Sequence, residues 1–295
     1  MAMIEKKLRF AIFGNEFQAK KSASIQKVLS TLHDRNADVM IDMPFIDFLE
    51  SEHIEVAGVT AFDGDDFDTD FVISMGGDGT FLKAAARVGS KGFPIIGVNI
   101  GRLGFLSDTM PSEIDNAIDA IYKGNYELDD HFVISVEIKE ESGKVCSYAL
   151  NDIAILKRDT ASMISIHASI DKEYLVTYQA DGLIVSTPTG STAYNLSNGG
   201  PIMVPNSNTI CLSPVAPHSL NIRPIVINGN SKISLSVESR SHNFLVAVDG
   251  RSETFSEGAK ITIKKAPYSI YIVKLHNKRY YSILREKMMW GADVR

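Results

Sequence analysis

The segment Phe71–Leu82 joins a short apolar run, a glycine-rich turn and the start of a helical pattern. The run Phe71–Met75 is uncharged and predicts a buried strand, and Gly76–Thr80 reads Gly-Gly-Asp-Gly-Thr. From Thr80 onward apolar residues recur with helical spacing. A strand that enters a helix through a glycine turn directs backbone N–H groups and the positive end of the helix dipole to one point. The segment therefore predicts a site for an anion, and phosphate is the usual one.

Asp78 is unexpected in such a turn, because a pure phosphate site would not favour a negative charge. A carboxylate beside a phosphate is useful when it holds a metal ion, or when it accepts the proton of a hydroxyl group that attacks phosphorus. The residues of the turn alone leave both roles open.

Composition narrows the class of protein. A chain of 295 residues with 44% hydrophobic and 22% charged residues is long enough for one large or two ordinary globular domains. The net charge of −6 argues against nucleic acid as a partner. No apolar run reaches membrane-spanning length, the N-terminus lacks a signal-peptide pattern, and Cys146 and Cys211 form no CxxC pair. We expect a cytoplasmic protein that does not bind a membrane.

The hydrophobic periodicity changes near Asp129. Before it, apolar strands such as Leu8–Phe13 and Pro94–Val98 alternate with helical patterns such as 22–33, which predicts a parallel sheet covered by helices. After it, alternating segments such as Phe132–Ile138 predict half-buried antiparallel strands.

We therefore predict two domains. Residues 1–106 plus 270–295 form an α/β domain with a parallel sheet that carries the glycine turn, and residues 107–269 form a β-rich, sandwich-like domain. The helical pattern of Tyr281–Trp290 predicts that the C-terminal segment packs back on the first domain.

A second motif, Asp181–Pro201, runs from a short apolar strand into a dense cluster of hydroxyl residues and glycines. Such a cluster offers many neutral donors and acceptors near an accessible backbone, which suits a sugar, an amide or phosphate oxygens. The alternative is a loop that caps its own helix, with Thr189 or Ser191 as the N-cap and Ala193–Leu196 as the helix start.

Four motifs together resemble the bacterial NAD kinase family. They are Gly76–Thr80, residues 99–106 (Asn-Ile-Gly-Arg-Leu-Gly-Phe-Leu), Asn151–Asp152 and Asp181–Pro201. The first motif is shared with phosphofructokinases and with diacylglycerol and sphingosine kinases, whereas the hydroxyl-rich motif is more discriminating. The resemblance implies transfer of a phosphoryl group from ATP or inorganic polyphosphate to the adenosine 2′-hydroxyl of NAD, which gives NADP.

Phosphoryl transfer asks a protein mainly to position its substrates and to neutralise charge. The resemblance makes Asp78 the catalytic base for the 2′-hydroxyl and assigns Gly76, Gly77 and Thr80 to the phosphate loop. The NAD-binding residues that it implies are Asp78, Gly79, Lys83, Phe105, Asn151, Asp152, Asp181, Thr192, Ala193, Tyr194, Asn195, Leu196, Ser197 and Ala216.

Simpler roles compete with several of these assignments. Asp78 could accept hydrogen bonds only from N–H groups of its turn, as aspartate commonly does. Lys83 could be an exposed helix lysine, and Phe105 could belong to the core. Asp152 lies in an apolar segment where a buried carboxylate needs partners, such as two ribose hydroxyls; the alternative is a solvated turn at a strand end.

Two positions depart from the family pattern. Gln179 is neutral where many relatives carry a basic residue, which leaves the preference between NAD and NADH open. Asp249–Arg251 resembles a late Asp-Gly-Gln turn of the family but ends in arginine. Arg251 could contact a phosphate or belong to a hairpin, and we favour the hairpin.

The histidines form no cluster with acidic residues, so we expect no metal site made by the protein alone. The resemblance implies that Mg²⁺ arrives with the nucleotide and bridges its phosphates. It also implies homodimers or homotetramers, in which a neighbouring subunit completes the dinucleotide site. The choice between ATP and polyphosphate stays open.

Two other functions compete with this one. A lipid kinase of the diacylglycerol type shares the first motif, although the polar loop Asp181–Pro201 does not suit a lipid tail. A catalytically silent dinucleotide-binding regulator is the alternative outside enzymes, although Asp78 is retained.

Overall fold

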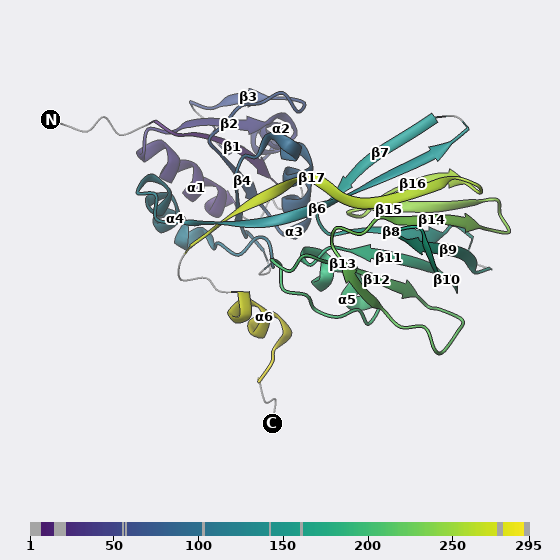
Figure 1. Cartoon of the computed structure of the whole chain (residues 1–295). Coiled ribbons are helices and arrows are strands. Elements are labelled where there is room, and N and C mark those ends of the chain that lie inside the picture. The colour runs from purple at the N-terminus through teal and green to yellow at the C-terminus, as the bar shows by residue number, and fades with distance from the viewer. Residues whose placement is uncertain are drawn as a thin grey trace. The chain divides into compact units, whose positions relative to one another are not determined.

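The computed structural model describes residues 7–14, 22–54, 56, 58–101, 104–141, 143–159, 162–275 and 280–291. The chain forms two compact units, Met1–Asp130 together with Ile270–Arg295, and His131–Ser269 (Figure 1). The predicted division ended the first segment at residue 106. The structure ends it after Asp130, because helix α4 (Ile114–Tyr122) buries its apolar side chains in the core of the first unit.

The first unit contains a parallel sheet and helices, which confirms the predicted α/β domain. Its strands follow the order β5-β4-β1-β2-β3: β5 (Ile95–Val98), β4 (Phe71–Met75), β1 (Arg9–Gly14), β2 (Asp38–Asp42) and β3 (Thr60–Phe62). The other helices are α1 (Ser22–Asp34), α2 (Met43–Ser51) and α3 (Asp78–Val88), with 3₁₀ turns η2 (Gly89–Lys91) and η3 (Pro111–Glu113).

The core of this unit follows the apolar pattern of the sequence. All five residues of β4 are buried, as expected for a strand of a parallel sheet that is covered on both faces. Helix α1 buries Ile25, Val28 and Leu32, which recur at helical spacing on one stripe. The strand and the helix thus take the places that their two periodicities predict.

The C-terminal segment returns to the first unit, as predicted. Strand β17 (Lys260–Lys274) reaches it at its end, where Ile272 pairs in parallel with Ile95 of β5. Helix α6 (Tyr280–Met288) follows and buries Ile283 and Leu284.

The second unit is a sandwich of two antiparallel sheets. One has the order β10-β9-β14-β17-β6-β7 and the other the order β13-β12-β11-β8-β15-β16. The strands are β6 (Glu127–Glu140), β7 (Gly143–Ala149), β8 (Asp152–Lys157), β9 (Ile164–Ile170), β10 (Glu173–Ala180), β11 (Gly182–Ser186), β12 (Thr209–Val215), β13 (Ile225–Asn228), β14 (Ile233–Glu238), β15 (Asn243–Val248) and β16 (Arg251–Ser256). Both sheets contribute to one hydrophobic core, for example through Leu235 of β14 and Ile155 of β8.

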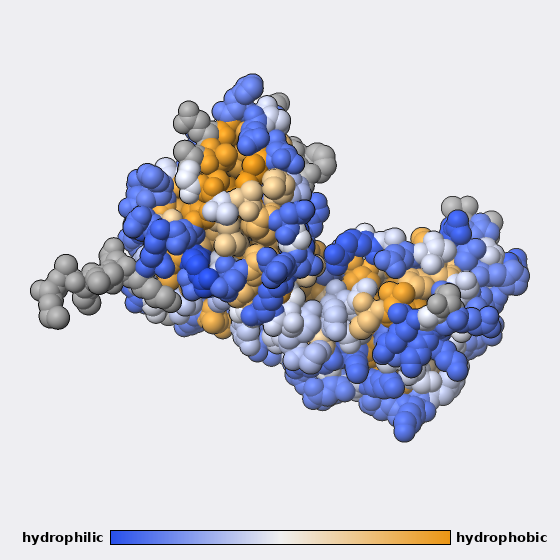
Figure 2. Space-filling view, turned by 90° about the horizontal axis from the view of Figure 1, so that it is seen from above, coloured by the Kyte–Doolittle hydropathy of each residue, from blue (hydrophilic) through white to orange (hydrophobic). Residues whose placement is uncertain are grey.

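The surface is mixed. Figure 2 looks onto the side of the first unit where β3 lies, and it shows hydrophobic residues gathered in the middle of that face with hydrophilic residues around them. None of the helices in the described part of the chain is long and apolar enough to cross a membrane.

Candidate active site

The glycine turn connects β4 to α3 in the first unit. The N–H of Gly76 donates to the Val98 carbonyl at 2.9 Å, which ties the turn to the neighbouring strand β5. Gly77 is the N-cap of α3, and its carbonyl accepts the N–H groups of Thr80 and Phe81. The first N–H groups of a helix have no partner within the helix, so this turn presents donors and a positive dipole end at one place.

Only part of this turn needs glycine for the fold. A Cβ at Gly76 would lie 2.2 Å from the Thr80 hydroxyl oxygen, so the packing of Thr80 requires glycine there. A Cβ at Gly77 or Gly79 would meet no described atom within 4 Å, and the φ of −91° at Gly77 suits any residue. A side chain at either position would therefore meet no described neighbour, and Gly77 is in addition a favoured residue at the N-cap of α3.

Asp78 lies in the first turn of α3 and holds a second segment of the chain. Its Oδ2 accepts the Phe105 N–H at 2.9 Å, and its Oδ1 accepts those of Leu106 at 3.0 Å and Ser107 at 3.1 Å. A Cβ at Gly104 would lie 2.0 Å from Oδ1, which explains the glycine there. The alternative for Asp78 was hydrogen bonding within its own turn; these three partners lie instead in the segment Phe105–Ser107.

These three bonds leave Asp78 some acceptor capacity. Each carboxylate oxygen has two lone pairs, so Oδ1 is fully used and Oδ2 can accept one more hydrogen bond. Asp78 can therefore hold the segment Phe105–Ser107 and still accept a bond from a hydroxyl group.

The other predicted residues of the first unit lie near this turn in different settings. Phe105 is half-buried, and the Lys287 ammonium of α6 lies 4.6 Å from its ring centroid, a cation–π distance. Lys83 is exposed on α3. Arg102 and Leu103, which belong to the predicted motif, lie outside the described residues. The roles of Phe105 and Lys83 stay predictions.

In the second unit, Asn151 and Asp152 lie at the start of β8 and are 8% and 6% exposed. The alternative of a solvated turn therefore does not hold. Thr187 clasps this segment from the hydroxyl-rich loop: its hydroxyl donates to the Leu150 carbonyl at 2.5 Å and its N–H to the Asn151 carbonyl at 2.9 Å. A Cβ at Gly190 would lie 2.1 Å from the same Asn151 oxygen, so the loop backbone packs directly on the segment.

Asp249 forms hydrogen bonds with the same segment, residues 150–152, from the side of β15. Its carboxylate accepts the N–H groups of Leu150 at 2.9 Å, Asn151 at 2.8 Å and Asp152 at 3.1 Å. The N–H of Asp249 donates in return to the Asp152 carbonyl at 3.1 Å. Sequence reasoning took Asp249 only as part of a turn and missed these contacts.

The two carboxyl groups of this cluster are electrostatically unusual. Burial, and then the nearby Asp249 charge, raise the pKa of Asp152 to about 7. Burial also raises the pKa of Asp249, while its three N–H donors and Arg251 oppose that rise. The Oδ1 atom of Asn151 is buried without a hydrogen-bond partner within the described structure. Such an acceptor is suited to a hydroxyl donor from a ligand.

The hydroxyl-rich loop contains 3₁₀ turn η4 (Thr189–Thr192) and helix α5 (Tyr194–Ser197). Neither uses a side chain as its N-cap, so the alternative of a loop capped by Thr189 or Ser191 does not hold. The Ser191 hydroxyl instead donates to the Pro188 carbonyl at 2.6 Å and accepts the Met203 N–H at 2.9 Å. These bonds close the loop on itself.

The predicted binding residues of this loop divide by exposure. Asn195 is fully buried, and its amide accepts the Ser213 hydroxyl at 2.5 Å and donates to the Pro201 carbonyl at 3.1 Å, so it holds the loop. Tyr194 and Ser197 are exposed, whereas the half-buried ones are Thr192, Ala193 and Leu196. All five remain accessible to a ligand, and their contacts with a dinucleotide, like that of Asn195, stay predictions.

Asp181 and Ala216 lie at the opposite end of β11. The Asp181 N–H donates to the Val215 carbonyl, next to Ala216, whose φ of 44° is unusual for a residue with a side chain. Asp181 and Thr187 are about 20 Å apart at about 3.3 Å per residue of strand. The structure thus does not bring Asp181 and Ala216 to the Asn151–Asp152 segment.

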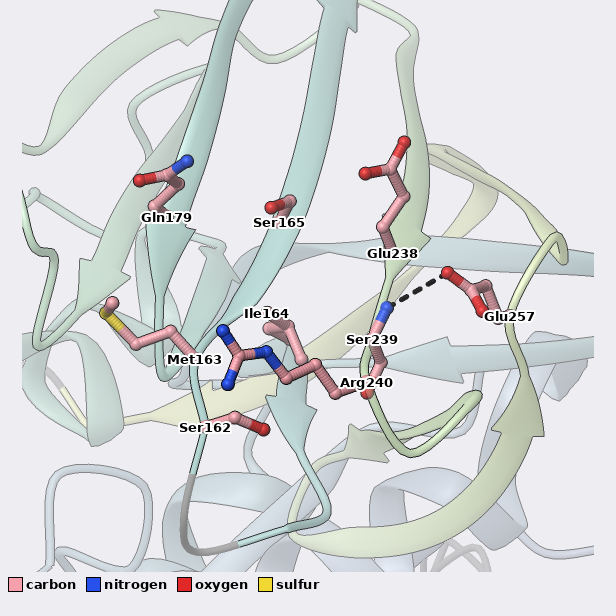
Figure 3. A pocket seen from close by; sticks show the side chains of 9 residues that line it. All are labelled: Ser162, Met163, Ile164, Ser165, Gln179, Glu238, Ser239, Arg240 and Glu257. Carbon is pink, nitrogen blue, oxygen red and sulfur yellow. Dashed lines mark hydrogen bonds between the residues drawn. The ribbon is translucent and has the colours of Figure 1, made fainter.

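Lys157 is another residue that sequence reasoning missed. Its ammonium forms an ion pair with Asp181 at 2.7 Å. Gln179 lines a separate pocket of about 570 Å³ together with Arg240, Glu238 and Glu257, and the Arg240 guanidinium points away from both carboxylates (Figure 3).

Asp249 and Gly250 form the two-residue turn between β15 and β16, with φ of 47° and 80°. Two residues with positive φ are typical of the tight turn that matches strand twist. Arg251 begins β16 and pairs with Val248, so the hairpin that we favoured for it is confirmed.

Within the described residues no group of three or more histidine, cysteine, aspartate or glutamate side chains is placed to hold a metal ion. The structure thus presents two polar clusters. One is a glycine turn with a carboxylate in the α/β unit, and the other is a buried amide and carboxyl group beside a hydroxyl-rich loop in the β-sandwich.

Comparison with known proteins identifies the family. Residues 10–126 match the family model of the ATP-NAD kinase N-terminal domain, and residues 150–275 match that of the C-terminal domain. An NAD kinase of Bacteroides fragilis is 53% identical over 98% of this chain and 100% of its own length. An NAD kinase of Porphyromonas gingivalis is 41% identical over 97% of this chain and 99% of its own. The chain belongs to the NAD kinase family.

Solved structures share the fold. Yeast NADH kinase complexed with NADH superposes with a TM-score of 0.88 at 22% identity and covers 98% of this chain and 89% of its own. An NAD kinase from Archaeoglobus fulgidus in complex with ATP has a TM-score of 0.70 at 26% identity, with 96% of this chain and 99% of its own covered.

Proposed function

We propose that this chain phosphorylates the adenosine 2′-hydroxyl of NAD, with ATP or polyphosphate as the donor, and so forms NADP. The observation that carries the proposal is the Asp78 carboxylate, which lies in the first turn of α3 beside Gly77 and Gly79 and has one lone pair of Oδ2 left. The relatives named NAD kinase and the related structure in complex with ATP support the choice of substrates.

The reaction needs one proton transfer and one in-line displacement. Asp78 Oδ2 accepts a hydrogen bond from the 2′-hydroxyl and takes its proton as the oxygen attacks the terminal phosphorus of the donor. A new oxygen–phosphorus bond forms, the bond from that phosphorus to the bridging oxygen breaks, and ADP leaves when ATP is the donor. The N–H groups at the start of α3 stabilise negative charge on the transferred group.

We propose that Mg²⁺ comes with the donor and is held mainly by its phosphates. The protein offers no three-residue metal cluster within its described part, and Oδ1 of Asp78 is used by two N–H groups. When bound, the ion would neutralise phosphate charge, a role that phosphates and water commonly support for Mg²⁺.

Asn151 and Asp152 are proposed to bind ribose hydroxyls. Asn151 offers a buried Oδ1 without a partner, and the carboxyl group of Asp152 lies next to it in the chain and is also buried. A hydroxyl group both donates and accepts, so a diol can satisfy an amide oxygen and a carboxyl group together.

We further propose a homodimer or homotetramer in the cytoplasm. Asp181 and Ala216 are too far along β11 from Asp152 to contact the same sugar, so they would contact another part of the dinucleotide or the dinucleotide of a second subunit. The two cysteines, Cys146 and Cys211, are both free, which is consistent with a reducing compartment.

The experiment that tests the function is an assay of the purified chain with NAD, NADH and diacylglycerol as acceptors, each with Mg²⁺ and either ATP or polyphosphate. An NADP-specific dehydrogenase reports the product. We expect NADP formation from NAD and no labelled lipid. Labelled lipid without NADP would favour a lipid kinase, and binding of NAD without any product would favour a silent regulator.

The Gly77→Ala variant is expected to fold, with a loss of stability of no more than about 1 kcal/mol from alanine at the N-cap, and to lose activity. Its methyl group meets no described atom within 4 Å, so the folded protein can accept it. It would occupy space that the donor phosphate needs, and we expect a rise of about tenfold in the KM for ATP. Thermal scans and initial rates check both statements. Ser90→Ala is the control, because Ser90 lies in η2 and is exposed. Gly143→Ala is not suitable as a control, because Gly143 has a positive φ. Unchanged kinetics in Gly77→Ala would contradict the phosphate-loop assignment.

A further inference from the structure

We propose that Asp249 is a positioning residue that fixes Asn151 and Asp152 for binding of a ribose diol, an inference that rests on the proposed function. Asp249 acts through the backbone of residues 150–152 and through its charge, and it does not itself contact the sugar.

Asp249 and residues 150–152 are joined by a set of hydrogen bonds in both directions, which we call the clasp. Oδ1 of Asp249 accepts the N–H groups of Asn151 and Asp152, and Oδ2 accepts that of Leu150. With the return bond from the Asp249 N–H to the Asp152 carbonyl, one residue makes four hydrogen bonds to three consecutive residues. A segment held in this way keeps its two polar side chains in one arrangement, which lowers the entropy lost when a ligand binds.

Two further observations indicate that the clasp serves a ligand. The Oδ1 atom of Asn151 is buried and has no hydrogen-bond partner within the described residues, which is costly unless a ligand satisfies it. The hydroxyl-rich loop packs on the opposite side of the same backbone through Thr187 and Gly190. The segment is therefore fixed from two sides around an unsatisfied acceptor.

Turn formation alone does not explain Asp249. Asp171 provides a comparison in the same unit, because it also has a positive φ, 51°, and its carboxylate also accepts a backbone N–H, that of Lys232 at 2.8 Å. Asp171 makes one such bond at an exposed position between β9 and β10, whereas Asp249 makes three in a buried cluster.

The charge of Asp249 has a second effect on the same pair. Asp249 is the charged neighbour that raises the pKa of Asp152, in addition to burial. Arg251 and Tyr268 face Asp249 in turn, while Ser186 of β11, opposite Asp152 in the sheet, is uncharged. Removal of the Asp249 charge should therefore let Asp152 ionise at a lower pH.

The test compares the full wild-type chain with the variant Asp249→Asn and with the matched control Asp171→Asn. Asparagine is chosen because this residue tolerates positive φ. For each protein, kcat and the KM values for NAD and ATP are measured from pH 5.5 to 8.5, together with the melting temperature. In Asp249→Asn we expect the KM for NAD to rise about tenfold, with smaller changes in kcat and in the KM for ATP. We also expect the midpoint of the pH dependence of the NAD KM to move to lower pH, and the kinetic constants of Asp171→Asn to match those of the wild type.

Wild-type KM and midpoint in Asp249→Asn would overturn the inference and leave the proposed function intact, whereas absence of NADP from the wild type would refute the proposed function. Equal losses in all kinetic constants would also overturn the positioning role. If the variant does not fold, hydrogen exchange in the unmodified chain decides. Slow exchange at the amides of residues 150–152, slowed further by NAD, supports the clasp, and fast exchange at these amides overturns it.

Discussion

The Asp78→Asn variant is expected to lose about 10²- to 10⁴-fold in turnover, the range typical of a lost general base. An amide cannot take the proton of the 2′-hydroxyl at any useful pH. Initial rates of NADP formation at saturating NAD and ATP measure the loss.

The structure adds a second expectation for this variant. An asparagine oxygen can still accept the N–H groups of Leu106 and Ser107, but its NH₂ group would face the Phe105 N–H, where Asp78 Oδ2 now accepts a hydrogen bond. Two opposed donors loosen the segment at Phe105, so we expect the KM for NAD to rise by several-fold as well.

Asp115→Asn is the matched control for Asp78→Asn. Asp115 also lies in the first turn of a helix of the same unit, α4, but its carboxylate bonds Lys27 and Thr31 far along the chain from the glycine turn. We expect the Asp115→Asn variant to form NADP at the wild-type rate. Turnover within threefold of wild type in Asp78→Asn would refute the base assignment, because the remaining contacts of Asp78 are structural.

Local features of this fold could be predicted from the sequence. The strand β4, the glycine turn and α3 are contiguous, so the periodicity and the glycines contain the required information, and the helix starts at Asp78, two residues before the expected start at Thr80. The hairpin at Asp249–Gly250 could also be predicted, because the residues that determine its turn are adjacent in the sequence.

Long-range contacts could not be predicted in this way. The bond between Asp249 and Asp152 joins residues 97 positions apart, and it depends on β15 pairing with β8 in one register. The ion pair of Lys157 with Asp181 depends in the same way on the pairing of β8 with β11. A single sequence indicates where the strands are but not their register. It therefore shows which residues are polar, but not which of them form contacts across the sheet.

The loop after Asp181 shows the same limit. Its hydroxyl residues were rightly assigned to a polar loop, but the sequence could not separate those that bind a ligand from those that hold the loop. Ser191 and Asn195 are buried and bond the backbone around them, whereas Tyr194 and Ser197 are exposed. The separation depends on burial, which is set by the packing of the loop against β12 through Ser213.

The Asp152→Asn variant is expected to be more stable than the wild type at pH 8 and equal to it near pH 4. The folded-state pKa of Asp152 is about 7, against 3.8 for the same carboxyl group in an unfolded chain. Between these values the folded state holds a proton that the unfolded state has released, so the free energy of unfolding falls as pH rises from about 4 to about 7 and is level above that. The full shift corresponds to a cost on the order of 4 kcal/mol at pH 8, and asparagine does not bear it.

Thermal unfolding of both proteins at pH 4.5, 6, 7 and 8 measures this difference, at about 2–4 °C per kcal/mol for a unit of this size. Asp171→Asn is the control of opposite sign: hydrogen bonds from the Lys232 N–H and Ser231 lower the pKa of Asp171, so its replacement should decrease stability at pH 8. A melting-temperature difference between Asp152→Asn and wild type that does not grow from pH 4.5 to pH 8 would show that Asp152 is ionised without cost. The carboxyl group would then need a fixed positive partner in place of the burial beside Asp249, and the ribose hydroxyls would have to compete with that partner for its oxygens.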